Sequence, residues 1–96
     1  MQLHTLNRTP AQSLVYRQVL TAMGADDYLL LIEDAVQGAL PQLVGHFEGL
    51  RGRLYVQEED LTARGLLERC DSSVKVVNVD GFVALTEQAD KVLSWY

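Results

Sequence analysis

The clearest feature of the chain is a run of four large aliphatic residues, Leu29–Ile32, bounded on both sides by acidic pairs. Asp26-Asp27 precede the run and Glu33-Asp34 follow it, which leaves the length of about one strand, whereas a buried helix would need more residues. A strand that is apolar on both faces is typical of a parallel sheet covered by helices. The pattern therefore predicts a central buried strand with two carboxylates at its carboxyl end.

Apolar segments elsewhere predict further strands that alternate with helices. Residues 91–95 fit either a strand or a continuation of the last helix, and the strand is favoured. Short connections between such elements imply right-handed β-α-β crossovers. The predicted fold class is therefore α/β: a three-layer arrangement in which two helical layers enclose a parallel sheet of four to five strands. The expected strands are residues 2–6, 29–32, 53–56, 74–79 and 91–95, and the expected helices are residues 10–23, 35–47 with a break near residue 40, 61–69 and 82–88.

Several polar residues and one glycine mark the expected helix ends. Thr9 fits the N-cap of the first helix, and Gln12 stands three residues later, as in a capping box. Gly24 suits the left-handed position that closes this helix. Asp34 and Asp60 are expected to cap the second and third helices.

Composition narrows the functional classes. The 96 residues are enough for one domain, so residues 1–96 are expected to form a single domain. Hydrophobic residues make up 48% of the chain, which leaves apolar surface for a partner. The net charge of −5 and the pI near 4.8 disfavour direct nucleic-acid binding, because that affinity rests on Lys and Arg. No signal peptide or membrane span is predicted, so the expected location is cytoplasmic.

Cys70 is the only cysteine and therefore the one candidate sulfur acceptor. Arg64 and Arg69 lie close to it in the sequence, which would favour that role. However, Cys70 is expected at the C-terminus of a helix, where the helix dipole disfavours a thiolate, and Asp71 adds repulsion. A passive thiol is therefore the favoured interpretation. A single cysteine also excludes an internal disulfide and any metal site built from several thiolates.

The other titratable residues form no complete active site. Glu33 and Asp34 suggest an acid/base pair, but neighbours on a strand point to opposite faces, so a cap and a loop carboxylate are favoured. His4 is expected to be structural and His46 to lie on the surface, because neither has a metal-ligand neighbour at helical spacing. No metal site and no cofactor is predicted.

Three weaker signals concern binding. Asn7–Thr9, at the mouth of the first helix, are candidates for binding an anion, although no glycine-rich loop accompanies them. Asp26-Asp27 resemble a phosphoacceptor cluster but precede a strand instead of following one. Trp95, Tyr96 and Tyr55 are amphipathic aromatic residues of the kind enriched at interfaces, and a fold-back onto the domain is equally consistent with their positions.

Four segments carry a family resemblance. The chain opens with LHTLNRTP (Leu3–Pro10), continues with LLIEDAV (Leu30–Val36) and EDLTARGL (Glu59–Leu66), and closes with DGFVALT (Asp80–Thr86) before a tryptophan near the end. In this order and spacing the segments resemble the DsrH/TusB family of sulfur-relay proteins, with Ala35 where the family usually has glycine.

The resemblance implies a DsrE-like fold and a hetero-oligomer with homologous TusC/DsrF-like and TusD/DsrE-like subunits. Such complexes relay persulfide sulfur toward 2-thiouridine at the tRNA wobble position, or serve sulfur oxidation. The principal sulfur-accepting cysteine belongs to the TusD/DsrE-type subunit. Some family members also carry a cysteine in the first helix, but residues 10–23 have none, and Cys70 is not at a position where the family calls for one. This favours a non-catalytic subunit and the tRNA branch.

Three alternatives stay open at this point. The first is a stand-alone thiol sulfur carrier that uses Cys70. The second is a DsrH-type subunit of a sulfur-oxidation complex. The third, more distant, is a flavodoxin-like module for a small ligand.

Overall fold

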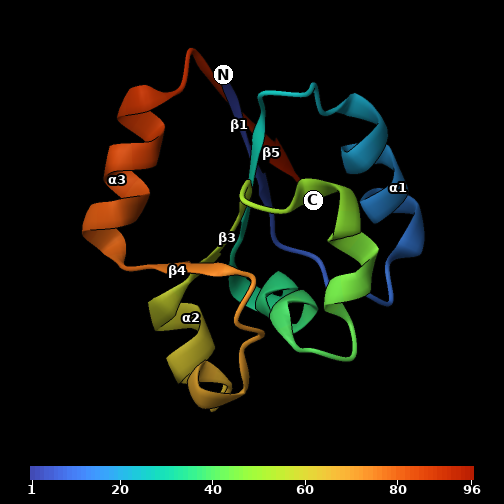
Figure 1. The fold of residues 1–96 in the computed structure, drawn as a ribbon, viewed down its shortest axis with the longest axis vertical. Coiled ribbons are helices and arrows are strands. Elements are labelled where there is room, and N and C mark those ends of the chain that lie inside the picture. Colours follow the sequence, from blue (N-terminus) through green and yellow to red (C-terminus); the bar gives the residue numbers. More distant parts are fainter.

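The computed structural model describes residues 1–96 and contains a parallel sheet of five strands in the order β4-β3-β2-β1-β5 (Figure 1). All four strand pairings are parallel, as predicted. The strands are β1 (Gln2–Leu6), β2 (Tyr28–Leu31), β3 (Leu54–Gln57), β4 (Lys75–Val77) and β5 (Lys91–Trp95), and the helices are α1 (Ser13–Ala22), the 3-10 helices η1 (Glu33–Ala39) and η2 (Val44–Leu50), α2 (Glu58–Ala63), the 3-10 helix η3 (Leu67–Arg69) and α3 (Val79–Gln88).

The strand order determines which face each helix covers. From β1 to β4 every crossover steps in the same direction, so right-handed connections place α1, η1, η2 and α2 on one face. The chain then returns past β1 to β5, which places α3 on the opposite face, as Figure 1 shows. The first face is covered by a cluster of 16 buried apolar residues, whereas the α3 face has a fully buried cluster of only three. The helical layers are therefore unequal.

β2 is the buried central strand that the aliphatic run predicts. Leu29 and Leu31 pack in the larger cluster, and Leu30 packs on the α3 face with Leu3 and Leu85. All three β2 leucines are fully buried, and each such burial stabilises the fold by about 2 kcal/mol. Apolar side chains on both faces of one strand thus hold the two helical layers to the same sheet.

The ends of α1 differ from the prediction. The helix begins at Ser13, because residues 9–12 form a turn in which the Thr9 carbonyl accepts the Gln12 amide at 2.9 Å. No side chain caps the helix, so the capping box is wrong. Gly24 is not left-handed either, since the only glycines with positive φ are Gly52 and Gly65. Its amide instead donates to the Asp27 carboxylate at 2.9 Å, and this contact shapes the turn into β2.

The connection from β2 to β3 is broken where the sequence predicts, but its type differs. Leu40 is extended and separates η1 from η2, so a 3-10 pair replaces the expected α-helix. Asp34 and Asp60 are predicted to cap helices, and neither does. The N-cap residue of η1 is Ile32, and that of α2 is Gln57, whose side chain accepts the Asp60 amide at 2.8 Å. Both carboxylates are used in other contacts, described below.

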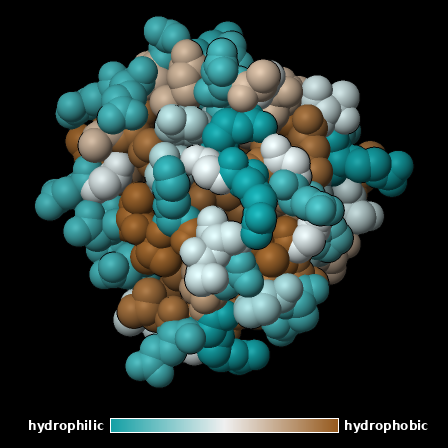
Figure 2. Space-filling view, viewed as in Figure 1, coloured by the Kyte–Doolittle hydropathy of each residue, from teal (hydrophilic) through white to brown (hydrophobic).

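The C-terminal third settles the open choice in favour of a fifth strand, since residues 91–95 pair in parallel with β1. β4 is shorter than expected because α3 begins early, at Val79, where the Asn78 side chain accepts the Gly81 amide at 2.9 Å. Seven large hydrophobic side chains remain exposed among hydrophilic ones (Figure 2). Every helix in the structure is too short or too polar to cross a membrane.

Candidate functional site

The candidate site lies at the edge of the sheet where the parallel strands end. Asn7–Thr9 follow β1 and Glu33-Asp34 follow β2. Asp60 lies in α2, which directly follows β3, and Arg64 is the C-cap residue of α2. This is the edge at which open α/β sheets place their ligands. Three of the four segments that carry the family resemblance, far apart in the sequence, therefore meet at one place in the fold.

Asp60 of α2 and the C-cap residue Arg64 hold in place the corner formed by Glu33 and Asp34, just after β2. Arg64 donates through Nε and Nη2 to one oxygen of Asp34, at 3.2 and 3.0 Å. Asp60 accepts a hydrogen bond from the backbone amide of Glu33 at 2.7 Å. Glu33 has a φ of 50°, a left-handed conformation that costs a non-glycine residue free energy, and the Asp60 contact stabilises it there. Asp34 is thus half of an ion pair, and the two carboxylates do not form an acid/base pair.

The space beside this corner is small and polar. A pocket of about 230 Å³ is lined by Asn7, Arg8, Thr9, Gln12, Glu33 and Asp34, none of which is hydrophobic. Oδ1 of Asn7 is buried without a hydrogen-bond partner. Two carboxylates face one arginine in this lining, which disfavours the anion site that the sequence suggested. The lining contains no cysteine, histidine or lysine, so it suits binding better than nucleophilic chemistry.

Cys70 lies elsewhere in the fold, just after η3 and ahead of β4. Its side chain is partly buried against the larger core cluster, and Sγ donates to the Asp71 carbonyl at 3.6 Å. Burial raises the pKa of the Cys70 thiol, and the negative charge of Asp71 raises it further. The thiol is therefore protonated at neutral pH and is a poor nucleophile.

A buried network joins β1, the turn before β2, and β5. The Trp95 indole donates to Nδ1 of His4 at 3.1 Å, so that nitrogen is an acceptor and the His4 proton lies on Nε2. Nε2 donates to Asp27 at 3.2 Å, and the same carboxylate accepts the amides of Gln2 and Gly24, both at 2.9 Å. His4 is fully buried, as expected for a structural histidine. Asp27 is a structural acceptor and not a phosphoacceptor.

The remaining candidates do not form a common site. Tyr55 packs beside Tyr28 on the α3 face, with ring centroids 5.2 Å apart, whereas Trp95 packs against the larger cluster on the other face. Of the two alternatives that the sequence left open, Trp95 shows the fold-back onto the domain. His46 is exposed, with its ring edge-on to Tyr16, as expected for a surface histidine. The structure contains no group of three or more His, Cys, Asp or Glu side chains that could hold a metal ion.

Sequence reasoning missed the partners of the functional side chains more often than the side chains themselves. The Arg64–Asp34 and Trp95–His4 pairs are separated by 30 and 91 residues. No periodicity or short motif connects positions so far apart, so only the strand order could reveal these contacts.

A family model, two named proteins and one solved structure are similar to the chain. Residues 8–92 match the family described as DsrH like protein. Protein TusB of Serratia proteamaculans is 39% identical, and Protein TusB of Escherichia coli O1:K1 is 32% identical, and both alignments cover 97% of this chain and 99% of the relative. The crystal structure of the ychN protein from E. coli is similar in fold, with a TM-score of 0.72, 18% identity and 97% coverage of each chain.

Replacement of Asp27 by asparagine should destabilise the fold by about 2 kcal/mol at neutral pH, because an amide cannot accept all three hydrogen bonds of the carboxylate. The Gly24 amide has the largest effect and lowers the pKa of Asp27 in the folded state; burial opposes it, and the Gln2 amide and His4 lower the pKa further. The contribution of a lowered pKa is present above the unfolded value, near 4, and is lost as the pH falls through the folded value.

Urea unfolding of wild type and Asp27→Asn between pH 3 and pH 7 measures this effect. The difference in free energy of unfolding should be constant at the upper end of the range and shrink below about pH 4. Asp26→Asn, at the exposed neighbouring carboxylate, is the matched control and should change stability by less than about 0.5 kcal/mol. A difference that grows toward low pH would contradict the assigned network.

Alkylation of Cys70 by iodoacetamide should be on the order of tenfold slower in the folded protein than in the urea-unfolded chain at the same pH, because burial raises the thiol pKa. The rate should keep rising through pH 9 in the folded protein. Intact mass spectrometry over a time course measures both rates. A folded rate at neutral pH equal to or above the unfolded rate would show an activated thiolate.

Proposed function

The chain belongs to the DsrH family, and from this premise we propose that it is a non-catalytic subunit of a sulfur-relay complex that supports 2-thiouridine formation at the tRNA wobble position. The relatives named Protein TusB match it over nearly their whole length, which supports a common role. In this proposal the chain acts in the cytoplasm as a single domain of 96 residues and performs no covalent step of its own.

The observation that carries the non-catalytic assignment is the surroundings of Cys70. Its thiol pKa is raised by burial and by Asp71, whereas a sulfur acceptor needs a thiolate. The thiol also precedes β4, while three of the four segments that resemble the family meet where the strands end. A persulfide relay through this chain would therefore have to use Cys70, a thiol that is protonated at neutral pH.

The proposed partners are homologous subunits of the TusC/DsrF and TusD/DsrE types, one of which supplies the reactive cysteine. The exposed apolar surface supports assembly, because seven large hydrophobic side chains remain exposed on this small chain. A net charge of −5 argues that any contact with tRNA is made by other subunits.

The two rivals differ in chemistry or in pathway. A stand-alone thiol carrier would form a persulfide on Cys70 of the isolated chain. A DsrH-type subunit of a sulfur-oxidation complex would assemble in the same way but leave tRNA unmodified. Identity to proteins named TusB favours the tRNA branch.

The decisive experiment replaces Cys70 by serine and coexpresses the chain with the two homologous subunits in a host that lacks its own copies. The Cys70→Ser variant should copurify with both subunits and restore 2-thiouridine to the wild-type level, since the reactive sulfur resides on another chain. Mass spectrometry of nucleosides from purified tRNA measures the modification.

Loss of 2-thiouridine while the complex still assembles would assign the relay step to Cys70. The rival carrier predicts that the isolated wild-type chain gains one sulfur atom after incubation with a sulfane-sulfur donor. Intact mass spectrometry of the free chain before and after reduction detects that product.

A further inference from the structure

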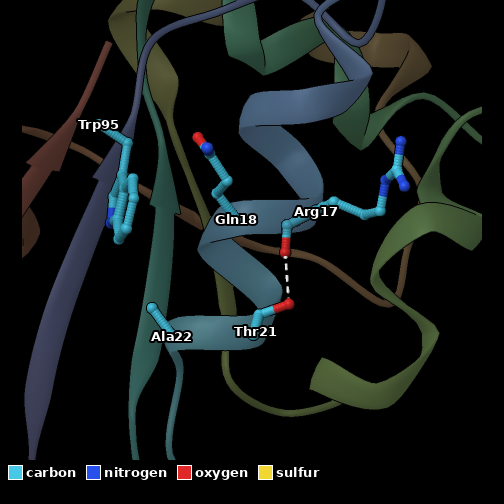
Figure 3. A pocket seen from close by; sticks show the side chains of 5 residues that line it. All are labelled: Arg17, Gln18, Thr21, Ala22 and Trp95. Atoms are coloured by element: carbon cyan, nitrogen blue, oxygen red, sulfur yellow. Dashed lines mark hydrogen bonds between the residues drawn. The ribbon is translucent and has the colours of Figure 1, made fainter.

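A groove runs between α1 and β5 on the more heavily covered face. Its volume is about 490 Å³, and it is lined by Arg17, Gln18, Thr21, Ala22 and Trp95 (Figure 3). The Trp95 ring faces Gln18 and Ala22 across the groove, whereas the Arg17 side chain points away from it. The Thr21 hydroxyl is already bonded to the Arg17 carbonyl at 2.8 Å. The groove therefore presents mostly apolar surface.

Trp95 is held in place before any partner arrives. Its indole donates to Nδ1 of His4 at 3.1 Å, and the two ring planes are 21° apart. His4 is fully buried and is fixed in turn by Asp27. A large aromatic side chain that is already ordered loses little entropy on binding, which is the property of an interface anchor.

The strand that carries Trp95 is an open edge of the sheet. β5 pairs only with β1, so its outer backbone groups have no partner strand. Edge strands are usually protected by shortness or by charge, and β4, the opposite edge, has only three residues. β5 has five residues and a single charged side chain, Lys91. Val92 is 43% exposed and the following Tyr96 is 73% exposed.

The charge of this flank is opposite to that of the whole chain. The only charged side chains in α1 and β5 are Arg17 and Lys91, both basic, although the chain carries a net charge of −5. Neither residue takes part in an ion pair. Lys91, Leu93 and Trp95 lie on the same face of β5, because alternate residues of a strand point the same way.

We infer that an extended segment of a homologous subunit docks beside β5, adding a strand to the sheet, with a large apolar side chain in the groove against Trp95 and a carboxylate opposite Lys91. Trp95 and Lys91 are four residues apart on one face, so the two partner side chains are four residues apart as well. This inference rests on the proposed function, since it takes its occupant from the same complex.

A second exposed apolar surface offers the natural comparison. Val79 and Val83 stand on the outer side of α3, 55% and 47% exposed, and Figure 2 shows hydrophobic atoms gathered left of centre, near β4 and the first turn of α3. That surface has no open strand edge of comparable length, because β4 has only three residues. It therefore serves as the control face.

Two matched substitutions test the groove in the complex with the coexpressed subunits. Ala22→Glu fills the groove with a carboxylate, and Ala84→Glu adds the same side chain at an exposed position of α3. Ala22→Glu should weaken association by about tenfold or more, and Ala84→Glu by less than about twofold. A charge pair repeats the comparison: Lys91→Glu should weaken association, and Lys75→Glu, on the opposite edge strand, should not. Thermal unfolding of each isolated variant checks that the chain still folds.

The single tryptophan gives a direct readout of the same contact. The chain labelled with 5-fluorotryptophan gives one fluorine resonance, from residue 95, which should shift when the unlabelled subunits are added to wild type. The shift should persist in Ala84→Glu, whereas Ala22→Glu should need about tenfold more of the subunits to show it.

The outcomes separate this inference from the proposed function. If the complex forms but the resonance does not move, or if Ala84→Glu is the variant that weakens association, the docking site is wrong while the proposed function stands. If the isolated chain forms a homodimer that Ala22→Glu abolishes, the occupant is a second copy and the inference is overturned. If wild type forms no complex with either subunit, both the inference and the proposed function fail.

Discussion

The structure depends on the pairing of its last strand with its first. β5 returns from the far edge of the sheet to lie beside β1, and the Trp95–His4 hydrogen bond links the two strands across 91 positions. His4 is also hydrogen-bonded to Asp27, whose carboxylate accepts the amides of Gln2 and Gly24. One neutral imidazole thus connects three segments of the chain, and no part of this network is free to act as an acid, a base or a ligand.

This return of the chain also explains the unequal faces. Three crossovers in one direction contain five helical segments and place the larger core on one side, and the single reverse crossover leaves α3 alone on the other. The same step makes β5 an edge strand and opens the groove beside α1. The surfaces that suit a partner therefore follow from the order of the strands, not from an unusual local sequence.

The functional proposal joins two kinds of observation. Similarity to proteins named TusB supports the proposed sulfur-relay role, and the surroundings of Cys70 argue against sulfur chemistry on this chain. The polar pocket at the carboxyl edge is lined by no cysteine, histidine or lysine, and contacts from Asp60 and Arg64 hold its two acidic residues in place. A subunit that orders surfaces for its neighbours fits these features better than an enzyme does.

The sequence determined the fold class, the buried central strand and the parallel sheet, because these follow from local hydrophobic pattern and from the handedness of the crossovers. The four family-like segments also identified the DsrH family and its DsrE-like fold, which the match over residues 8–92 and the structural likeness to the ychN protein confirm. The helix ends could not be predicted from the sequence as well. Thr9, Asp34 and Asp60 are residue types that commonly serve as N-caps. In the structure, however, Thr9 belongs to a turn, and Asp34 and Asp60 make hydrogen bonds to distant residues.

Only the tertiary structure decided which side chains meet. Hydrogen bonds join Asp34 to Arg64, Glu33 to Asp60 and Trp95 to His4. They form because parallel strands bring residues from different parts of the chain to the same end or face of the sheet. Local propensity carries no information about such contacts, since the free energy that selects them arises only after the strands are ordered. The pattern of the chain thus specifies its layers, and the strand order specifies its surfaces.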